Sequence, residues 1–428
     1  MRCLFVTHYF PPETGAAPSR LYDWARRLAA WGHQVTVVAP VPNYPRGRIF
    51  PEYRDRFFYE ERVGNLRVLR TRIYVNRSAG FAQRMLSYFS FVFCSILVGI
   101  IKVRRQDVVL VESPPLFLGL SGLVLKTCLR AKMVLNVSDL WPETAVAMGI
   151  VRNRFLIQLS VGLEEFLYRQ SCLVTAQTQY MVADIRKRVK VPVALITNGV
   201  DLEVFSDGAL GKREAQRVAF NFSNKFVVGY TGLFGMAQDL DLVLDAAELL
   251  RNVPDILFAL FGDGPEKQRL HAEVQRRRLE NVRFFMPQPS HTMPALMAGF
   301  NAAVVPLKRL DLFKGALPCK LFECMAAGTV VLVAIAGEAQ ELVEDAEGGI
   351  CVPPEDAASL VAGILRLRAD PSLQRRLACN ARSYIALHYN REQIAARLQD
   401  LLVEAAGIPE QAVAHEDRHG YRSAPTIR

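Results

Sequence analysis

Two opposite charges, Lys320 and Glu323, lie three residues apart in the otherwise apolar stretch PCKLFECMAAG, residues 318 to 328. Pro318 suits the first turn of a helix, and the preceding run AAVVPL predicts a strand. A helix that begins at the carboxyl end of a parallel strand presents free N–H groups and a positive dipole end, which bind anions. We expect Lys320 to contact phosphate and Glu323 to accept hydrogen bonds from sugar hydroxyls; an ordinary i,i+3 surface pair is the alternative.

Two glycine-containing turns in the second half of the chain have the same strand-to-helix setting. Gly232 follows a strand in YTGLFGMAQ, and it would let the backbone approach a diphosphate closely. Gly262 and Gly264 lie in LFGDGPEKQRL, where the turn could receive a nucleotide base or ribose. Asp239 and Asp241 form a DxD pair, but they start an amphipathic helix, so helix capping is favoured over metal binding.

Apolar runs alternate with amphipathic stretches along the first half of the chain, which predicts strands and helices in turn. The strands are uniformly apolar, so we expect a parallel sheet that is covered by helices on both faces. The predicted strands of this sheet are residues 2 to 8, 34 to 40, 107 to 113, 131 to 139, 172 to 177 and 193 to 201.

A second alternating set follows the polar segment 200 to 225, where we place the domain boundary. Its predicted strands are residues 226 to 232, 255 to 264, 281 to 287, 302 to 307 and 329 to 337. We expect two domains, residues 1 to 200 and 201 to 387, with a helix at about 388 to 406 joining the first domain and a disordered tail at 407 to 428. Two doubly wound sheets in tandem favour ligand binding in the cleft between them.

Composition narrows the class of protein. The 428 residues are 51% hydrophobic and 22% charged, which excludes a disordered chain. The eight cysteines are scattered without CxxC pairs, so we expect neither a disulfide framework nor a metal site, and a reducing cytoplasm is the simplest setting. Residues 1 to 200 hold 27 basic and 13 acidic side chains, against 25 and 29 in the rest. This asymmetry indicates that the first half meets nucleic acid, a membrane surface or a phosphorylated ligand.

One segment departs from the strand-and-helix pattern. Residues 85 to 101, MLSYFSFVFCSILVGII, contain no charge, and arginines and lysines flank them on both sides. The sheet pattern expects a buried crossover helix here. Aromatic residues and flanking cations also suit a helix that lies against a membrane. A full span is the least favoured interpretation, because it would put the two flanks of one domain on opposite sides of the membrane.

Several short motifs occur together in a fixed order. They are PPETGAAP, SDLWPE (138 to 143), ITNGVD (196 to 201), YTGLFGMAQ, FGDGPE, PCKLFECMAAG and GEAQELVEDAEGGICVPPED (337 to 356). With these motifs the chain, up to about residue 405, resembles glycosyltransferase family 4, retaining enzymes with the α/β GT-B fold of two Rossmann-like domains. Within the family it looks most like bacterial exopolysaccharide and O-antigen transferases of the N-acetylfucosaminyl and colanic acid type.

The resemblance implies roles for individual residues. Glu323 would bind the ribose hydroxyls of a nucleotide diphosphate sugar, and Lys320 would lie near its diphosphate. The loop containing Gly15 would lie by the diphosphate and the reacting sugar, and Asp139 would face the anomeric carbon as the other catalytic candidate. No metal cofactor is implied. The donor site expected from the resemblance comprises Lys320, Glu323, Gly232, Gln238, Gly262, Gly264, Gly315, Leu317 and Pro318.

Five positions depart from the family pattern. Gly315 stands where many members have a glutamate eight residues before Glu323, so the resemblance implies no contact from such a glutamate to the donor sugar. Leu233 and Gln238 stand where an arginine and a lysine are common, which leaves Lys320 as the best cation for the diphosphate. The remaining two departures are Ser138, where histidine is frequent, and Asp239, where glycine is usual.

The leading interpretation is a retaining glycosyltransferase that uses a UDP- or GDP-sugar. Its acceptor would be a polyprenyl-diphosphate-linked saccharide, and the protein would lie on the cytoplasmic face of the inner membrane as a peripheral protein that binds no nucleic acid. A GT-B-like sugar nucleotide epimerase and a non-catalytic nucleotide-sugar-binding scaffold are the alternatives. An NAD-dependent dehydrogenase is disfavoured, because no GxGxxG follows the first strand.

Overall fold

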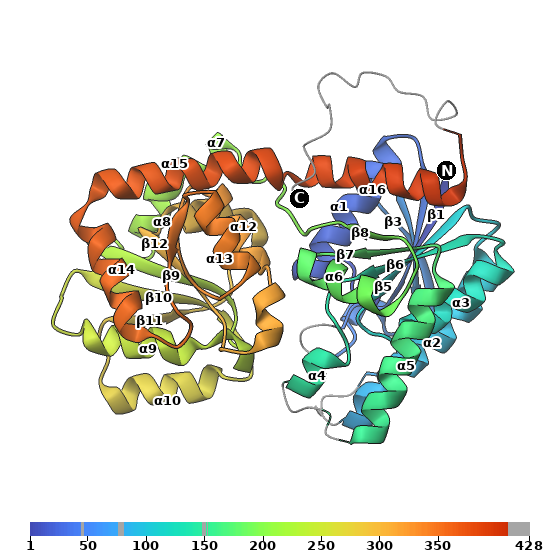
Figure 1. Ribbon diagram of the computed structural model, residues 1–428, viewed down its shortest axis with the longest axis horizontal. Coiled ribbons are helices and arrows are strands. Elements are labelled where there is room, and N and C mark those ends of the chain that lie inside the picture. The colour runs from blue at the N-terminus through green and yellow to red at the C-terminus, as the bar shows by residue number, and fades with distance from the viewer. Residues whose placement is uncertain (44–46, 76–80, 148–150, 152, 410–428) are drawn as a thin grey trace.

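Two separate sheets form the protein, each inside its own cover of helices (Figure 1). The computed structural model describes residues 1–43, 47–75, 81–147, 151 and 153–409. The predicted tail therefore lies outside the described residues, apart from its first three positions. The GT-B class of fold, two Rossmann-like α/β domains in tandem, is confirmed.

The first sheet has eight strands in the order β3-β4-β2-β1-β5-β6-β7-β8. All neighbouring strands are parallel except β3, which pairs antiparallel with β4 at the sheet edge. The strands are β1 (Arg2–Val6), β2 (Gln34–Pro40), β3 (Phe58–Val63), β4 (Leu66–Thr71), β5 (Val108–Ser113), β6 (Lys132–Val137), β7 (Leu173–Ala176) and β8 (Val193–Leu195).

Helices bury both faces of this sheet, as uniformly apolar strands require. One core contains side chains from α1 and α16, and the other contains side chains from α2, α3, α5 and α6. Helix α3 packs against both α2 and α5. The helices of this domain are α1 (Ala16–Ala30), η1 (Pro51–Tyr53), α2 (Phe81–Lys102), α3 (Leu118–Cys128), α4 (Glu143–Ala147), α5 (Arg154–Gln170) and α6 (Gln179–Arg188).

Helix α2 is the crossover from β4 to β5 and packs on β2, β4 and α3. By length and composition alone its residues 82–102 could cross a membrane, with a mean hydropathy of 1.9 in a window that is 33% buried. Core helices of other proteins pass the same test. Its place between two strands of one sheet agrees with the predicted crossover.

The second sheet has six parallel strands in the order β11-β10-β9-β12-β13-β14. Helices α9 and α14 lie over one face, and α12 and α13 lie over the other. The strands are β9 (Phe226–Leu233), β10 (Ile256–Asp263), β11 (Val282–Phe285), β12 (Ala302–Pro306), β13 (Val330–Ala334) and β14 (Gly349–Cys351). The helices are α7 (Asp207–Leu210), α8 (Arg213–Ala219), η2 (Met236–Gln238), α9 (Leu240–Leu249), α10 (Lys267–Arg277), η3 (Ser290–Thr292), α11 (Met293–Ala298), η4 (Asp311–Gly315), α12 (Cys319–Ala326), α13 (Glu338–Asp345), α14 (Ala357–Ala369) and α15 (Pro371–His388).

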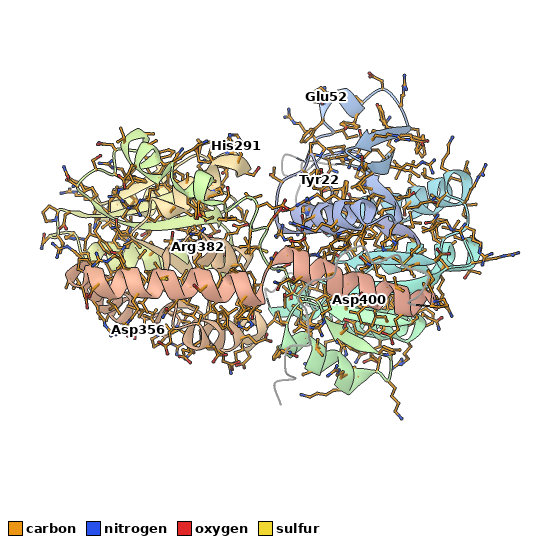
Figure 2. All side chains as sticks on the ribbon, turned by 90° about the horizontal axis from the view of Figure 1, so that it is seen from above. Tyr22, Glu52, His291, Asp356, Arg382 and Asp400 are labelled. Carbon is orange, nitrogen blue, oxygen red and sulfur yellow. The ribbon has the colours of Figure 1, made fainter. Side chains whose placement is uncertain are left out.

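The chain crosses between the domains twice. Helix α15 lies on the second domain, and α16 (Arg391–Ala406) returns to the first, where it packs on α1 (Figure 1). Arg382 on α15 and Asp400 on α16 mark these two positions in Figure 2. Val200 and Asn390, from the two crossing segments, form a parallel bridge, so both connections lie side by side.

Three parts of the fold differ from the sequence prediction, and the first is β14, a three-residue strand that was not predicted. The hairpin β3–β4 was not predicted, because β3 alternates in exposure at the sheet edge and carries four charged or polar side chains among its six residues. Helices α7 and α8 lie inside the polar segment assigned to the domain boundary, where they pack on α11. Short elements on a polar surface give little periodic signal.

Candidate active site between the domains

A buried ion pair lies at the carboxyl edge of the first sheet. Arg20 of α1 donates to Glu112, near the end of β5, over 2.5 Å, and both side chains are 2% exposed. The same guanidinium donates to Ser138 Oγ over 2.7 Å and to the side-chain oxygen of Asn198. Since isolated buried charges are costly, this pairing fixes the ends of several strands against α1.

Further hydrogen bonds extend this network below the ion pair. Asn136 Nδ2 donates to the second carboxylate oxygen of Glu112 over 2.5 Å, and Thr175 Oγ1 donates to Asn136 Oδ1 over 2.8 Å. Arg391 at the start of α16 donates to the carbonyl oxygens of Asn198 and Gly199, over 3.3 and 3.2 Å. The first domain therefore holds a buried, mutually hydrogen-bonded polar network beneath the site.

The second domain places Lys320 opposite, in the first turn of α12. Its ammonium group lies 2.7 Å from Tyr230 Oη, 3.1 Å from Gln238 Oε1 and 3.9 Å from the centroid of the Tyr230 ring. Burial lowers the pKa of this half-buried amine to about 7. The partners are an uncharged hydroxyl, an amide and a ring face, so the charge remains available for an anion.

Glu323 lies one turn further along α12 and is half-buried. No ion pair joins it to Lys320, and no hydrogen bond engages its carboxylate within the described part of the chain. Burial raises its pKa, and the positive charges of Arg391 and Lys320 oppose this shift. The ordinary i,i+3 ion pair, which was the alternative interpretation, is therefore not formed, and the carboxylate is available to accept hydrogen bonds.

The amino end of α12 faces the polar network of the first domain. Pro318 is the residue before the helix rather than its first residue. Burial raises the pKa of the neighbouring Cys319 thiol to about 11, and Arg20 and Arg391 of the other domain are close enough to oppose this shift. The site thus contains groups from both domains.

Three predicted glycines come together at the ends of β9 and β10. Gly232 has φ 134°, and a side chain there would lie 3.1 Å from Lys320 Nζ. At Gly262 a Cβ atom would lie 1.9 Å from the carbonyl oxygen of Gly232, and at Gly264 it would lie 2.4 Å from that of Phe234. The backbone therefore leaves no room for side chains at 262 and 264, and Gly232 places a turn without a side chain beside Lys320.

Gly15 and Asp139 lie in the first domain. Gly15 has φ 141° and immediately precedes α1, the helix that carries Arg20. Asp139 follows Ser138, and its Oδ1 accepts a hydrogen bond of 2.6 Å from Thr144 Oγ1. Burial raises the pKa of the Asp139 carboxyl to about 6. This hydrogen bond ties Asp139 to the first turn of α4.

Gly315, one of the positions that depart from the expected family pattern, lies against the other domain. A Cβ atom at this position would be 2.5 Å from Cβ and Cγ of Tyr180, the second residue of α6. Beside it, the Glu338 carboxylate of α13 accepts hydrogen bonds from the backbone N–H groups of Gln179, over 3.0 Å, and Tyr180. Glu338 therefore caps a helix of the opposite domain, and the aromatic ring occupies the space of a side chain at 315.

A small pocket of about 370 Å³ opens beside this contact, between α4, α5, α6 and η4. Leu317 lies on the segment that connects η4 to α12. The pocket is lined by Pro142, Glu143, Val146, Ile157, Val161, Tyr180 and Leu312.

The DxD pair, Asp239 and Asp241, was predicted to cap a helix, and the structure shows other roles for both side chains. Asp239 has φ 44° at the start of α9 and makes no side-chain capping hydrogen bond, so the predicted cap is wrong at this position. Its Oδ2 is buried without a partner among the described residues, and burial raises its pKa to about 6. Asp241 forms two hydrogen bonds of 2.8 Å with Arg269. Within the described residues, no group of three or more metal-ligating side chains forms here.

Several residues of the site were missed from the sequence. Glu112 is the last residue but one of an apolar strand, VVLVES, and a charge near the carboxyl end of a buried strand is a usable signal. Arg20 looked like one of several arginines on an amphipathic helix, and Tyr230 looked like a core residue of β9. Tyr180 and Glu338 become recognisable only when the two domains are placed together.

Two family models match the chain. "Glycosyl transferase 4-like domain" matches residues 15–199, and "Glycosyl transferases group 1" matches residues 212–384. WcaI of Escherichia coli strain K12, named as a colanic acid biosynthesis glycosyl transferase, is 29% identical over 84% of this chain and 90% of its own. The glycosyltransferase WbjE of Pseudomonas aeruginosa is 26% identical over 71% and 77%.

Solved structures show the same fold at low identity. Sucrose-phosphate synthase from Thermosynechococcus elongatus superposes with a TM-score of 0.75 at 19% identity, over 94% of this chain and 98% of that one. HepE from Anabaena, in complex with UDP and glucose, gives a TM-score of 0.69 at 19% identity, over 94% and 100%.

Proposed function

Because the chain belongs to the glycosyltransferases, with a 4-like domain followed by a group 1 domain, we propose that it transfers a sugar from a nucleotide diphosphate sugar in cell-surface polysaccharide biosynthesis. The observation that carries this proposal is the environment of Lys320. An ammonium group at the start of a helix, beside backbone turns without side chains, suits a diphosphate. The relative WcaI is named for the biosynthesis of colanic acid, which is a polysaccharide.

The donor would bind mainly to the second domain. Lys320 and the amino end of α12 would neutralise the diphosphate, and the turns at Gly232 and Gly264 would let the backbone approach the nucleotide. Glu323 has a free carboxylate, so it would accept hydrogen bonds from the ribose hydroxyls. Gln238 already contacts Lys320 and would hold the ammonium group toward the diphosphate.

The transfer would proceed with retention of the anomeric configuration. The bond from the anomeric carbon to the diphosphate oxygen breaks, the bond to the acceptor oxygen forms on the same face, and the acceptor proton passes to the leaving diphosphate. Lys320 would stabilise the negative charge that develops on this leaving group. The hydrogen bond from Thr144 supports a positioning role for Asp139, which would hold the loop before α4 beside the acceptor.

The acceptor would be a polyprenyl-diphosphate-linked saccharide at the cytoplasmic face of the inner membrane. Apolar side chains of α2 and α5 are exposed on the same flank of the first domain, among them Phe93 at 67%, Ile101 at 65% and Phe155 at 70%. Exposed cations at both ends of α2, Arg84 and Lys102, flank this surface. An apolar face with cationic borders suits the interface of an anionic membrane.

A transfer assay tests the proposal. Purified protein is incubated with UDP-, GDP- and dTDP-sugars and with lipid-linked saccharides, and the product is analysed for a new glycosidic bond and its configuration. We expect extension of an acceptor with retention. If the protein neither hydrolyses a donor nor extends an acceptor, and Lys320→Ala leaves nucleotide affinity unchanged, the proposal is wrong. The same assay without acceptor would detect an epimerised donor, the product of the alternative enzyme class.

A further inference from the structure

An open pocket of about 1080 Å³ lies on the first domain, apart from the residues assigned to sugar transfer. It is bounded by the segment around η1, by the residues that follow β4 and by one side of α2. Figure 2 shows Glu52 of η1 at the border of this domain away from α16. The residues lining the pocket are Gly47, Arg48, Ile49, Arg54, Phe57, Arg72, Ile73, Tyr74, Val75, Ser90 and Cys94.

Three exposed arginines give the pocket its charge. Arg48, Arg54 and Arg72 come from three separate positions in the chain, and none forms an ion pair with a described residue. Arg54 donates one hydrogen bond, of 3.3 Å, to the carbonyl oxygen of Ile49. No acidic side chain is among the described residues that line the pocket. The pocket therefore concentrates positive charge without internal compensation.

Two arginines of the neighbouring hairpin β3–β4, in contrast, form ion pairs with glutamates. Arg67 pairs with Glu60 over 2.7 Å, and Arg70 pairs with Glu61 over 2.7 Å. These pairs take up the two acidic residues of β3. Three guanidinium groups left at one concave surface suit phosphate oxygens, which arginine binds in a bidentate manner.

The apolar surface of α2 begins at the wall of the pocket. Ser90 and Cys94 of α2 line it, and Phe89, Phe93 and Leu97 on the adjacent turns are exposed. A ligand in the pocket would thus lie with its anionic part among the arginines and with hydrocarbon beside α2. A cationic pocket beside an apolar helix face suits a phospholipid or a lipid diphosphate better than a soluble nucleotide.

We propose that this arginine pocket binds the phosphate or diphosphate group of a membrane lipid whose hydrocarbon chain lies along α2. The inference rests on the proposed membrane contact and adds a specific site to it. Two sources share this chemistry, namely the diphosphate of a polyprenyl-linked acceptor and the headgroup of an anionic phospholipid.

The position of the pocket has a geometric consequence for the first source. The pocket borders β4 and the site borders β5, which are three strand spacings apart, or roughly 14 Å along the sheet edge. Both follow the carboxyl ends of their strands, so they open on the same edge of the sheet. An acceptor whose diphosphate occupies the pocket would therefore need a saccharide of more than one residue to reach the site.

Vesicle sedimentation with the full chain tests the proposal. The vesicles contain phosphatidylcholine alone, phosphatidylcholine with phosphatidylglycerol, or phosphatidylcholine with a small share of undecaprenyl diphosphate. The pocket variant is Arg48→Gln, Arg54→Gln and Arg72→Gln combined. The matched control, Arg375→Gln, Arg376→Gln and Arg397→Gln, removes the same charge from exposed positions on α15 and α16.

We expect the pocket variant to bind anionic vesicles at least about tenfold more weakly than the unmodified protein, with the control within about twofold, because distant charges are screened. Stronger loss on undecaprenyl diphosphate identifies the acceptor as the source, and stronger loss on phosphatidylglycerol identifies the phospholipid. Equal loss in both variants, or no preference of the unmodified protein for either anionic vesicle, would overturn the proposal. Nucleotide binding by the pocket variant shows that it is folded and separates this outcome from failure of the proposed function.

Discussion

Lys320 offers the sharpest test of how the donor is bound. Its amine has a pKa of about 7 because it is buried beside Tyr230 and Gln238, which carry no charge. Half of the free protein therefore carries the ammonium form near pH 7, and about one molecule in a hundred carries it at pH 9. Because a diphosphate binds the protonated form, the affinity of the protein for the diphosphate should fall as the pH rises above 7.

The size of the effect follows from the same populations. The apparent Kd equals the intrinsic Kd divided by the fraction of protein in which Lys320 is protonated. The Kd for the nucleoside diphosphate should therefore rise about fiftyfold between pH 7 and pH 9, which is a loss of ~2.3 kcal/mol in binding free energy. Lys320→Met removes a charge-assisted hydrogen bond, which costs about 1.5 to 3 kcal/mol, or roughly 10- to 150-fold in Kd at pH 7. In this variant the dependence on pH above 7 should disappear.

Isothermal titration calorimetry with UDP or GDP, at constant ionic strength and in buffers of different ionisation heat, measures both effects. At pH 7 the unmodified protein should take up about half a proton on binding. Lys225→Met is a suitable control, since Lys225 precedes β9 at the other end of the strand and donates to the Pro254 carbonyl oxygen. A Kd independent of pH in the unmodified protein, or the same slope in Lys320→Met, would refute the reasoning.

Three further predictions concern a close backbone contact, a buried ion pair and a contact between the two domains. Gly262→Ala should destabilise the fold by on the order of 2 kcal/mol, because its Cβ would lie 1.9 Å from a carbonyl oxygen, whereas Gly208→Ala, with nothing within 4 Å, should leave the melting temperature within about a degree or two. Arg20→Met should cost about 3 to 5 kcal/mol in urea unfolding, since it leaves the Glu112 carboxylate buried without its partner; a loss below about 1 kcal/mol would contradict this view. Glu338→Gln should weaken the contact between the domains by about 1 to 2 kcal/mol, seen as a larger radius of gyration in solution scattering with nucleotide bound, and an unchanged radius would argue against capping across the domains.

The sequence was sufficient for every strand except β3, β4 and β14, and for the position of Lys320. The strands are apolar throughout because both faces are buried, so their order along the chain was readable. Lys320 and Glu323 were recognisable because charges are rare on a helix that is otherwise buried. The expected contact of Gly15 and Asp139 with the donor stays a prediction.

Local sequence patterns could not predict the contacts between the two domains. Tyr180 lies against Gly315, and no periodicity connects positions so far apart in the chain. The same contact gives a physical reason for the glycine, which looked from the sequence like a missing functional group. Asp239 was also unpredictable, since its left-handed backbone conformation depends on the turn between η2 and α9.

The return of α16 to the first domain has a consequence for synthesis of the protein. Four side chains of this helix, Ile394, Ala395, Leu398 and Leu402, complete the core that α1 shares with the first sheet. They are translated about 200 residues after the last strand of that sheet, which corresponds to roughly 10 to 40 s on the ribosome. During this interval the part of this face that α16 later covers, beside α1, stays exposed in the nascent first domain, so a chaperone that binds apolar surface should associate with it until translation ends.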